Sequence, residues 1–343
     1  MGEVKKELSF DELQGKIIAI DAYNTIYQFL SIIRQPDGTP LTDSKGRVTS
    51  HLSGLLYRTT NLLNYGAIPV FVFDGIPPAL KSKTIAARIS RREKATEEWK
   101  TAQEKGMLAE ARTHAMASTR ITKEIVASAK ELLGYMGMPC IQAPSEGEAQ
   151  AAYLVENGVA YASASQDYDS FLFGAEIVMR NVTITGKRKL PGKNIFINVK
   201  PEKILLKDLL SKFEISRRQL VWAGMMIGTD FNDGIKGVGP KTALKIVKEA
   251  KSIEEVQNML QSKYGTRLED AEEVEKVFME PDVTKISNQE FQKLLSEASL
   301  DKENLMKFMC DEHGFSDERV NKMISLLSMA KKEKRQKGIN SWM

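Results

Sequence analysis

Three hydrophobic segments of this chain each end in an aspartate, and this pattern constrains the fold more than any other feature. The segments are Ile17–Asp21, Val70–Asp74 and Tyr161–Asp167. Short apolar runs closed by polar residues are typical of buried strands in a parallel sheet, and such sheets bind ligands at the carboxyl ends of their strands. The sequence therefore predicts an α/β fold, with a mostly parallel central sheet flanked by helices and an acidic site at one sheet edge.

Size and composition fit a soluble globular protein. The chain has 343 residues, enough for one large domain or two modest ones, and 42% of them are hydrophobic and 27% charged. It contains no apolar run of about eighteen residues, so we expect no membrane span. Its first residues lack an apolar signal core. The two cysteines, Cys140 and Cys310, lie far apart, which indicates a reducing compartment without disulfides.

Basic residues are concentrated in two runs, although the net charge is only +4. The first run comprises Lys81, Lys83, Arg88, Arg91, Arg92 and Lys94, and the second comprises Lys331, Lys332, Lys334, Arg335 and Lys337. Taken alone, either run is typical of a solvated helix face. Beside an acidic pocket, however, positive stripes favour a polyanionic substrate held close to bound cations.

The pattern of apolar residues predicts three regions along the chain. Residues 1–200 contain the expected strands and form a sheet-centred core. Within this core, residues 81–116 are highly charged with weak apolar periodicity, so we expect a helical arm or lid there. Residues 201–330 read as mainly helical, and residues 331–343 as a flexible basic tail.

A β-hairpin is expected near the end of the core region. Alternating β-forming residues occupy positions 177–184 and 195–199, and the intervening residues 185–194 are rich in Gly, Pro and basic side chains. Two such runs joined by turn-forming residues predict a hairpin, here with a basic tip.

Carboxylates are the strongest candidates for a functional site. Seven stand out, namely Asp21, Asp74, Glu146, Glu148, Asp167, Asp169 and Asp230. Asp167 and Asp169 face the same way if the backbone between them is extended. Ser145 and Glu148 also match a capping box, in which the glutamate only satisfies a backbone donor. The expected convergence of these carboxylates at one sheet edge favours a functional site, because crowded like charges repel each other unless cations neutralise them.

The ligand types indicate which cations these carboxylates bind. Oxygen ligands suit Mg²⁺ or Mn²⁺, whereas His51, His114, His313 and two cysteines are too few and too scattered to favour zinc. Two hard cations roughly 4 Å apart are the standard arrangement for displacement at a phosphodiester, where one activates water and the other stabilises the leaving oxygen. No Ser-His-Asp or Cys-His arrangement competes as a nucleophile.

A glycine turn before a helix predicts a second binding site. The segment contains Gly237, Gly239, Lys241, Thr242 and Lys245, with Pro240 at the expected first helical position. Free backbone N–H groups at a positive helix end can bind a phosphate without reading sequence. The alternative is an ordinary turn between two helices.

Several long segments resemble one known family, in register along nearly the whole chain. They are IAIDAYNTIYQFL, VFVFDGIPPALKSKTIAARISRREKA, APSEGEAQAAYL, YASASQDYDSFLFG and GTDFNDGIKGVGPKTALKIV. Together they are similar to the archaeal and eukaryotic flap endonucleases, and the segment GKRKLPGKN favours an archaeal member.

The resemblance implies a PIN-like nuclease sheet, a helical arch and a helix–two-turn–helix element. By position, the seven carboxylates become the metal site, Lys81 and Arg88 face the scissile phosphate, and Tyr27 stacks on a nucleobase. It also implies that the turn from Gly234 to Gly239 holds a K⁺ ion through backbone carbonyls and contacts duplex DNA. An archaeal source would place the protein in the cytoplasm, and a eukaryotic one in the nucleus.

The C-terminal residues resemble the motif with which this family binds the sliding clamp, proliferating cell nuclear antigen. In that motif Gln336 occupies a polar pocket, while Ile339 and Trp342 fill an apolar one. Paired aromatic residues are usual at the last two positions, and this chain offers Trp342 and Met343.

These observations lead to one functional hypothesis and two alternatives. We expect a monomeric, Mg²⁺-dependent nuclease with two ions in its site, Mn²⁺ being a possible substitute. It would cut branched DNA at a 5′ flap during Okazaki fragment maturation and long-patch base excision repair, with 5′–3′ exonuclease activity on nicked or gapped duplex. The alternatives are a related exonuclease or bubble-cutting repair nuclease, and a non-catalytic junction or clamp adaptor.

Overall fold

A seven-stranded sheet forms the centre of the molecule. The computed structural model describes the backbone of residues 4–183, 186–189 and 196–340, and the side chains of residues 4–183 and 199–330. The strand order is β1-β9-β6-β5-β2-β3-β4. The strands are β1 Lys6–Glu7, β2 Ile17–Asp21, β3 Ile68–Phe73, β4 Cys140–Gln142, β5 Ala162–Ala164, β6 Ile177–Arg180 and β9 Glu202–Leu205.

Five adjacent strands, β6-β5-β2-β3-β4, are parallel, as the sequence predicts. β2 pairs in parallel with β3 and β5, β3 with β4, and β5 with β6, whereas β9 is antiparallel to both β6 and β1. The carboxyl ends of β2, β3, β4 and β5 therefore meet at one edge. The expected α/β fold is confirmed, with the acidic segments delivered to that edge.

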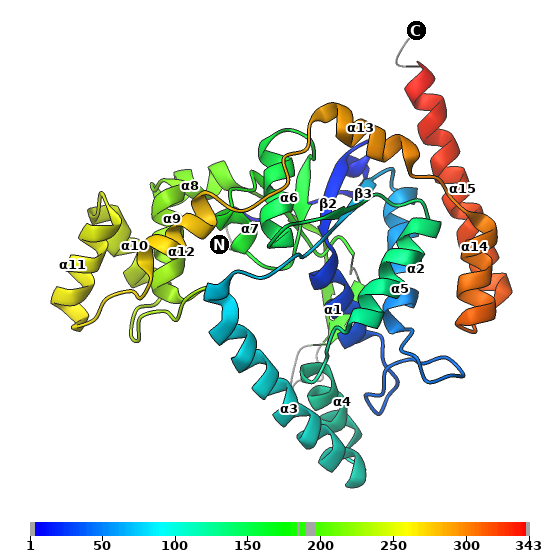
Figure 1. Cartoon of the computed structure of the whole chain (residues 1–343), viewed down its shortest axis with the longest axis horizontal. Coiled ribbons are helices and arrows are strands. Elements are labelled where there is room, and N and C mark those ends of the chain that lie inside the picture. Colours follow the sequence, from blue (N-terminus) through cyan, green and yellow to red (C-terminus); the bar gives the residue numbers. More distant parts are fainter. Residues whose placement is uncertain (1–3, 184–185, 190–195, 341–343) are drawn as a thin grey trace.

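Alternate residues along the strands supply two different cores. Ile18, Ile20, Phe71 and Phe73 belong to the larger cluster on one face, whereas Ala19, Val70 and Val72 belong to the cluster on the other. This division follows from the two-residue repeat of a strand, which sends successive side chains to opposite faces. Helices must therefore cover both faces, as in Figure 1.

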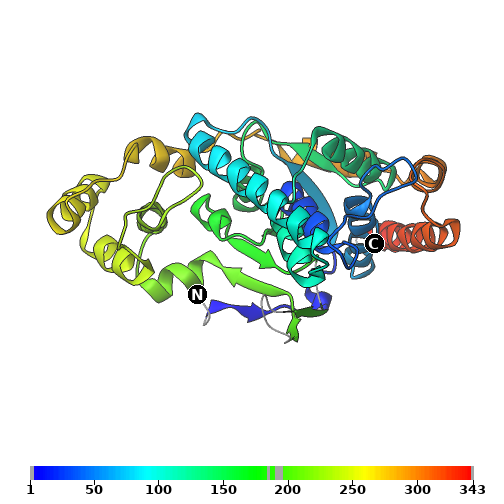
Figure 2. The same cartoon turned by 90° about the horizontal axis from the view of Figure 1, so that it is seen from below.

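Helices cover the two faces and one end of the sheet. The larger core contains α1 Ala22–Ile32, α2 Ser50–Asn64, α5 Lys123–Tyr135, α14 Lys302–Met306, the π-helical η4 Lys307–Glu312 and α15 Asp317–Asn340. The opposite face carries α6 Gly147–Glu156 and α13 Asn288–Glu297. A third cluster contains α7 Asp169–Leu172, α8 Leu206–Phe213, α9 Arg217–Ile227, α10 Pro240–Glu249, α11 Ile253–Tyr264 and α12 Ala271–Met279. Figures 1 and 2 place α10–α12 and α14–α15 at opposite ends of the molecule.

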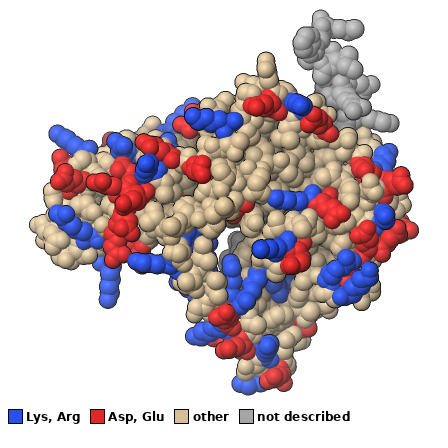
Figure 3. Space-filling view, in the orientation of Figure 1, with Lys and Arg blue, Asp and Glu red and all other residues tan. Residues whose placement is uncertain are grey.

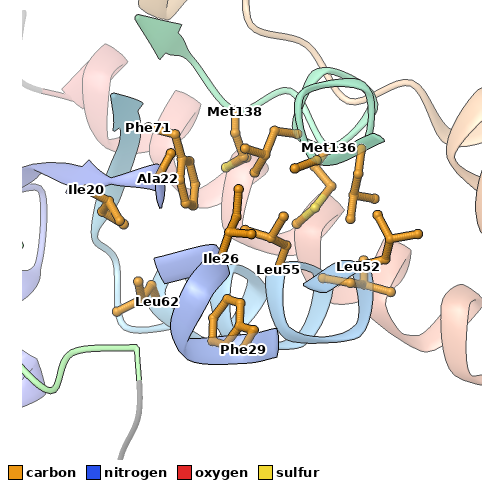
Figure 4. Packing of buried hydrophobic residues seen from close by; sticks show 14 of the residues in the cluster. Ile20, Ala22, Ile26, Phe29, Leu52, Leu55, Leu62, Phe71, Met136 and Met138 are labelled. Atoms are coloured by element: carbon orange, nitrogen blue, oxygen red, sulfur yellow. The ribbon is translucent and has the colours of Figure 1, made fainter. Parts of the chain in front are cut away.

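Helices α1 and α2 pack closely in the larger core, where Figure 4 shows Phe29 on α1 and Leu55 on α2. A Cβ atom added at Gly54 would lie 2.2 Å from Cγ of Phe29. At Gly134 in α5, by contrast, an added Cβ meets no atom within 4 Å. The two glycines therefore stand in helices of the same core with opposite steric surroundings.

We expect alanine at these two glycines to change stability in opposite directions. Gly54→Ala overpacks the contact with Phe29 and should lower the free energy of unfolding by about 1–3 kcal/mol. Gly134→Ala improves helix propensity without a clash and should raise it by about 0.5–1 kcal/mol. Urea unfolding of both variants and the parent measures the difference, and equal shifts at the two positions would contradict the packing argument.

The charged segment after β3 forms a helical arm, as expected. After the 3₁₀ turn η3 Ala79–Lys81, helix α3 Ser82–Glu104 is followed by α4 Leu108–Ala117, and the pair projects from the body of the molecule (Figure 1). Most α3 side chains are exposed, while Ala95, Ala102, Ala111 and Ala115 are buried. Trp99 ties the arm to the loop after α1, since its Nε1 donates to the carbonyl oxygen of Asp37 at 3.3 Å.

The expected hairpin is partly wrong. The first expected run instead contains β6, which pairs with β5 and β9 in the central sheet, and the hairpin is formed by β7 Gly186–Lys189 with β8 Phe196–Val199. Asn181 explains the break, since its φ of 60° ends the extended backbone just after Arg180. The tip at residues 190–195 lies outside the described residues.

Two further segments differ from the sequence-based division. The sheet continues past residue 200, because β9 joins it as a strand between β1 and β6. The backbone of residues 331–340, expected as a flexible tail, continues α15 to Asn340.

Within the described residues, no helix combines the length and apolar character needed to cross a membrane.

Candidate functional site

Two aspartates are fixed at the sheet edge by the helices that follow. Asp21 ends β2 and caps α1, with its Oδ1 accepting from the backbone N–H of Asn24 at 2.9 Å. Asp74 follows β3, and its Oδ1 accepts from the N–H of Gly147 at 2.8 Å. A Cβ at Gly147 would lie 2.6 Å from that oxygen, so glycine permits the close approach. The start of α6 is thereby fixed against the end of β3.

Both glutamates at the start of α6 belong to the site. Glu146 is the N-cap residue, and its Oε2 lies 2.5 Å from Nζ of Lys81. Glu148 does not form a capping box with Ser145; its Oε1 instead accepts from Oγ of Ser165 at 2.5 Å and of Ser170 at 3.2 Å. The capping alternative is therefore excluded, because Glu148 contacts the segment after β5.

The backbone between Asp167 and Asp169 is not extended. Tyr168 between them is in the right-handed helical region, with φ −91° and ψ −4°, and Asp169 begins α7. The condition for placing both side chains on one strand face is therefore not met. Asp167 nevertheless points toward α1, where its Oδ2 accepts from Nδ2 of Asn24 at 2.7 Å.

The seventh carboxylate comes from the helical region. Asp230 lies in the turn between α9 and α10, and its two oxygens contact the base of the arm. Oδ1 lies 2.5 Å from the guanidinium of Arg88 and Oδ2 lies 3.3 Å from Nζ of Lys81. The arm, the sheet edge and the helical region therefore meet at one point.

Burial and mutual repulsion raise the pKa values of the carboxylates. Asp21 is only 6% exposed. Burial and the charge of Asp74 raise the pKa of Asp21 to about 8, and burial and Glu146 raise the pKa of Asp74 to about 6. Burial and Asp230 raise the pKa of Asp169 to about 6. These pairs link carboxylates from five separate chain segments into one electrostatic cluster.

The remaining members complete this cluster. Burial, reinforced by Asp21 and Asp169, raises the pKa of Glu148, and burial with Asp230 raises the pKa of Asp167. Burial alone would lower the pKa of Lys81, but Glu146, Asp230 and Asp74 outweigh it and raise the pKa. Lys81 is therefore held charged among the acids.

The donor set fits hard divalent cations. All seven side chains offer only carboxylate oxygens, the ligands that Mg²⁺ and Mn²⁺ prefer. In the described part of the chain, no three His, Cys, Asp or Glu side chains are gathered closely enough to hold a metal ion as they stand. Lys81 and Arg88 form ion pairs with Glu146 and Asp230, and thereby occupy carboxylate oxygens that cations would use.

This electrostatic crowding predicts a pH-dependent stability of the metal-free protein. Because folding raises the pKa of Asp21 from 3.8 to about 8, its stabilising contribution is complete below pH 3.8 and is lost as pH rises through 8. From pH 6 to 8.5 the free energy of unfolding should fall by on the order of 1–3 kcal/mol more in the parent than in Asp21→Asn. Urea unfolding with chelator tests this, and parallel curves for the two proteins would contradict it.

Tyr27 lies close to a basic side chain of α3. Tyr27 lies on α1, and the guanidinium of Arg92 lies 5.9 Å from the centre of its ring. Figure 3 shows a hollow beside α3 with Lys and Arg side chains on its walls. The aromatic ring of Tyr27 thus lies beside a basic side chain of α3, the helix from which Arg88 contacts Asp230.

The glycine turn precedes a helix, as the sequence predicts. Gly237 has φ +88°, and Gly239 is the N-cap of α10, with Pro240 at the first helical position. Lys241 and Lys245 are exposed one helical turn apart, and Thr242 is partly exposed between them. The preceding turn is closely packed: a Cβ at Gly234 would lie 2.2 Å from the carbonyl oxygen of Ile227. The structure thus presents backbone N–H groups and two lysines on one exposed helix end.

The residues of the expected clamp motif are only partly described. The backbone of Gln336 and Ile339 lies in α15, while their side chains lie outside the described residues. Trp342 and Met343 lie outside them altogether.

Sequence reasoning missed the neutral side chains that hold the acids. Asn24 and Ser165 each hydrogen-bond a carboxylate, and Nε2 of Gln142 donates to the carbonyl oxygen of Asp74 at 2.6 Å. Arg180 supports the segment after β5 by donating to the carbonyl oxygen of Gln166 at 3.0 Å. No spacing rule marks such residues, although Asn24 does follow Asp21 by three, the distance of a helix cap.

Comparison with known families agrees with this geometry. Residues 1–95 match the family model described as XPG N-terminal domain, and residues 137–230 match the XPG I-region. The first region contains Asp21, Asp74 and the base of the arm, and the second contains the other five carboxylates. Both matched regions therefore converge on the acidic cluster.

Individual relatives resemble the whole chain. The chain is 49% identical to flap endonuclease 1 of Pyrococcus furiosus, with 100% of this chain and 98% of that protein covered. The structure is similar to flap endonuclease-1 from Methanococcus jannaschii, with a TM-score of 0.73, 37% identity and coverage of 96% and 97%. The catalytic core of Rad2 in complex with DNA substrate shares the fold, with a TM-score of 0.66, 23% identity and coverage of 95% and 97%.

The chain thus shares about half of its residues with a flap endonuclease over its full length, and it shares the fold of another. The acidic cluster at the sheet edge agrees with both similarities. The chain belongs to the flap endonuclease family, structure-specific, metal-dependent nucleases that hydrolyse phosphodiester bonds in branched DNA.

Proposed function

We propose that this chain cuts one phosphodiester where a 5′ flap leaves duplex DNA, using two Mg²⁺ ions at the acidic cluster. The observation that carries this proposal is the mutual electrostatic influence of the carboxylates at the sheet edge, beside the ion pairs of Lys81 and Arg88 with Glu146 and Asp230 at the base of the arm. A purely structural role would not account for so many acids at one sheet edge, because their charges repel each other and lower stability.

The metal ions would be held by Asp21, Asp74, Glu146, Glu148, Asp167, Asp169 and Asp230. When bound, they would supply an activated water and stabilise the leaving oxygen, a role that Mn²⁺ can also fill. The protein's part is to hold the carboxylates close together, although burial and mutual repulsion raise their pKa values, and bound cations would favour their charged form.

Lys81 and Arg88 act on the substrate in this proposal. Both carry long side chains that pair with Glu146 and Asp230 in the structure. When those acids bind cations, the two side chains are free to donate to the oxygens of the scissile phosphate and stabilise its growing negative charge. Tyr27, on the α1 face toward α3, is placed to stack on an unpaired base.

Duplex DNA would lie on the turn before α10. Backbone N–H groups in the first turn of α10 after Pro240, with the side chains of Lys241, Thr242 and Lys245, suit a phosphate contact that carries no sequence information. A K⁺ ion held by carbonyls of residues 234–239 would complete this contact. The single strand would then meet the arm, residues 81–116.

The wider role follows the family. We infer that the protein works as a cytoplasmic monomer in Okazaki fragment maturation and long-patch base excision repair, with exonuclease activity on nicked or gapped duplex. Gln336, Ile339, Trp342 and Met343 would bind the sliding clamp. Deleting residues 336–343 should then remove stimulation by the clamp and leave the basal cleavage rate unchanged.

A double-flap DNA labelled at its 5′ end tests the proposal. With Mg²⁺ we expect one product of the length set by the junction, and with chelator none. A ladder of mononucleotides would favour the related exonuclease instead. Tight binding without any cut would favour the non-catalytic adaptor.

A further inference from the structure

One asparagine contacts two carboxylates of the site that lie far apart in the sequence. Asn24 stands in the first turn of α1, where its backbone N–H donates to Oδ1 of Asp21 at 2.9 Å. Its side-chain Nδ2 donates to Oδ2 of Asp167 at 2.7 Å. A single residue therefore connects the end of β2 with the segment after β5.

The orientation of the Asn24 amide follows from its partner. An ionised carboxylate only accepts hydrogen bonds, so the NH₂ group of the amide must face Asp167. Asp167 has a second oxygen and further lone pairs, and accepting one bond leaves these available to a cation. The bond thus orients the carboxylate without using up its ligand capacity.

A serine makes a similar connection on the other side of Asp167. Oγ of Ser165 donates to Oε1 of Glu148 at 2.5 Å and accepts from the backbone N–H of Asp167 at 3.2 Å. Asn24 and Ser165 also line the same small cavity beside the site. Neutral donors therefore link Asp21, Asp167 and Glu148 in one hydrogen-bonded chain.

Neutral donors differ from Lys81 and Arg88 in what they do to a cation site. A charged partner neutralises a carboxylate and competes with the metal ion, whereas an amide fixes the carboxylate and leaves its negative charge in place. Such outer partners of metal ligands commonly change metal affinity or activity by about 10–100-fold when removed. Asn24 has the geometry of such a partner, and it connects two ligands rather than one.

We infer that Asn24 is a positioning residue of the metal site: its side-chain amide holds the Asp167 carboxylate beside Asp21, so that both carboxylates bind the same divalent cations. This inference rests on the metal site of the proposed function and adds a residue outside the seven carboxylates. It assigns to Asn24 a role in cation affinity and none in DNA binding.

The test measures Mn²⁺ binding to the full chain without DNA, by titration calorimetry at constant pH. Asn24→Ala removes the amide. In Asn24→Ser the hydroxyl oxygen is bonded directly to Cβ, one bond closer to the backbone than the amide nitrogen, and cannot reach Asp167. Both should bind Mn²⁺ about 10–100-fold more weakly than the parent. Thermal unfolding in chelator identifies any variant that fails to fold, and the other variant then carries the test.

Gln28 provides a matched control. It stands one helical turn after Asn24 and lines the same cavity. Its Oε1 accepts from Oγ1 of Thr183 at 3.3 Å, whereas the Asn24 amide donates to a carboxylate. Gln28→Ala removes an amide of the same kind from the same helix. It should bind Mn²⁺ within about twofold of the parent, since no ligand loses a hydrogen bond.

Cleavage kinetics separate positioning from a general structural effect. In Asn24→Ala the Mg²⁺ concentration at half-maximal rate should rise by the same factor as the Mn²⁺ dissociation constant. Saturating Mg²⁺ should restore most of the rate, and KM for flap DNA should stay unchanged. A structural defect would instead change KM and persist at saturating Mg²⁺, which would overturn the inference.

Two further outcomes have distinct meanings. If the parent and both Asn24 variants bind Mn²⁺ equally, Asn24 does not position the site, while the proposed function stands. If Asp167→Ala binds Mn²⁺ as tightly as the parent, the carboxylate metal site itself is wrong, and the inference fails with it.

Discussion

Replacing Asp169 by alanine is expected to slow flap cleavage by about three orders of magnitude or more. Asp169 opens α7 with its carboxylate among the acids, where burial and Asp230 raise its pKa to about 6. Metal ions at such sites supply several kcal/mol of transition-state stabilisation, and each 1.36 kcal/mol corresponds to a factor of ten in rate. Loss of one ligand should therefore remove most of the activity.

Single-turnover cleavage of a 5′ flap measures this effect. DNA affinity in chelator should change little, because the duplex is expected to bind the turn before α10 rather than the carboxylates. Glu176→Ala removes an equally charged but exposed side chain and should cut at the parent rate. Cleavage by Asp169→Ala at that same rate would show that the acidic cluster is not the metal site.

Lys81→Ala should produce two effects of opposite sign. The single-turnover rate at saturating Mg²⁺ should fall by about 10²–10³-fold, the usual loss when one donor to a developing negative charge is removed. Mn²⁺ binding to the free protein should become tighter, because Glu146 and Asp230 lose the cation that now pairs with them. A slower enzyme with a tighter metal site is the expected signature.

Lys83→Ala is the matched control for this variant. The substitution removes the same charge from the same end of α3. The Lys83 side chain, however, is 75% exposed and pairs with Glu269 outside the cluster. Its cleavage rate should stay within a few-fold of the parent rate. Weaker Mn²⁺ binding in Lys81→Ala would mean that the lysine supports the metal site rather than competing with it.

The sequence predicts the sheet and its acidic edge because both depend on local patterns. An apolar run closed by Asp21 or Asp74 carries its own signal, since a buried strand needs continuous apolar residues and the strand end returns to solvent. Parallel pairing of the strands then brings their carboxyl ends, and the aspartates on them, to the same edge of the sheet. The helix start at Pro240 was predictable for the same reason, as proline at the first turn needs no partner far away.

Other features depend on partners that no local pattern identifies. The hairpin strand was misplaced because the break at Asn181 requires a left-handed backbone that asparagine tolerates without demanding it. Asp167 and Asp169 share a site although the segment is bent, since tertiary contacts rather than strand geometry aim them. Asn24 and Ser165 hold carboxylates of the cluster through neutral hydrogen bonds, which leave no charge or spacing signature.

The larger core combines residues from the two ends of the chain, and this has a consequence for protein synthesis. Leu52 and Leu55 of α2 share that core with Leu305, Phe308 and Leu327, and β1 pairs with β9, nearly two hundred positions later. A ribosome therefore releases the first helices long before their partners emerge, leaving apolar surface uncovered meanwhile. Nascent chains halted before residue 300 should be degraded or held by chaperones, so the last helices determine when the whole enzyme becomes stable.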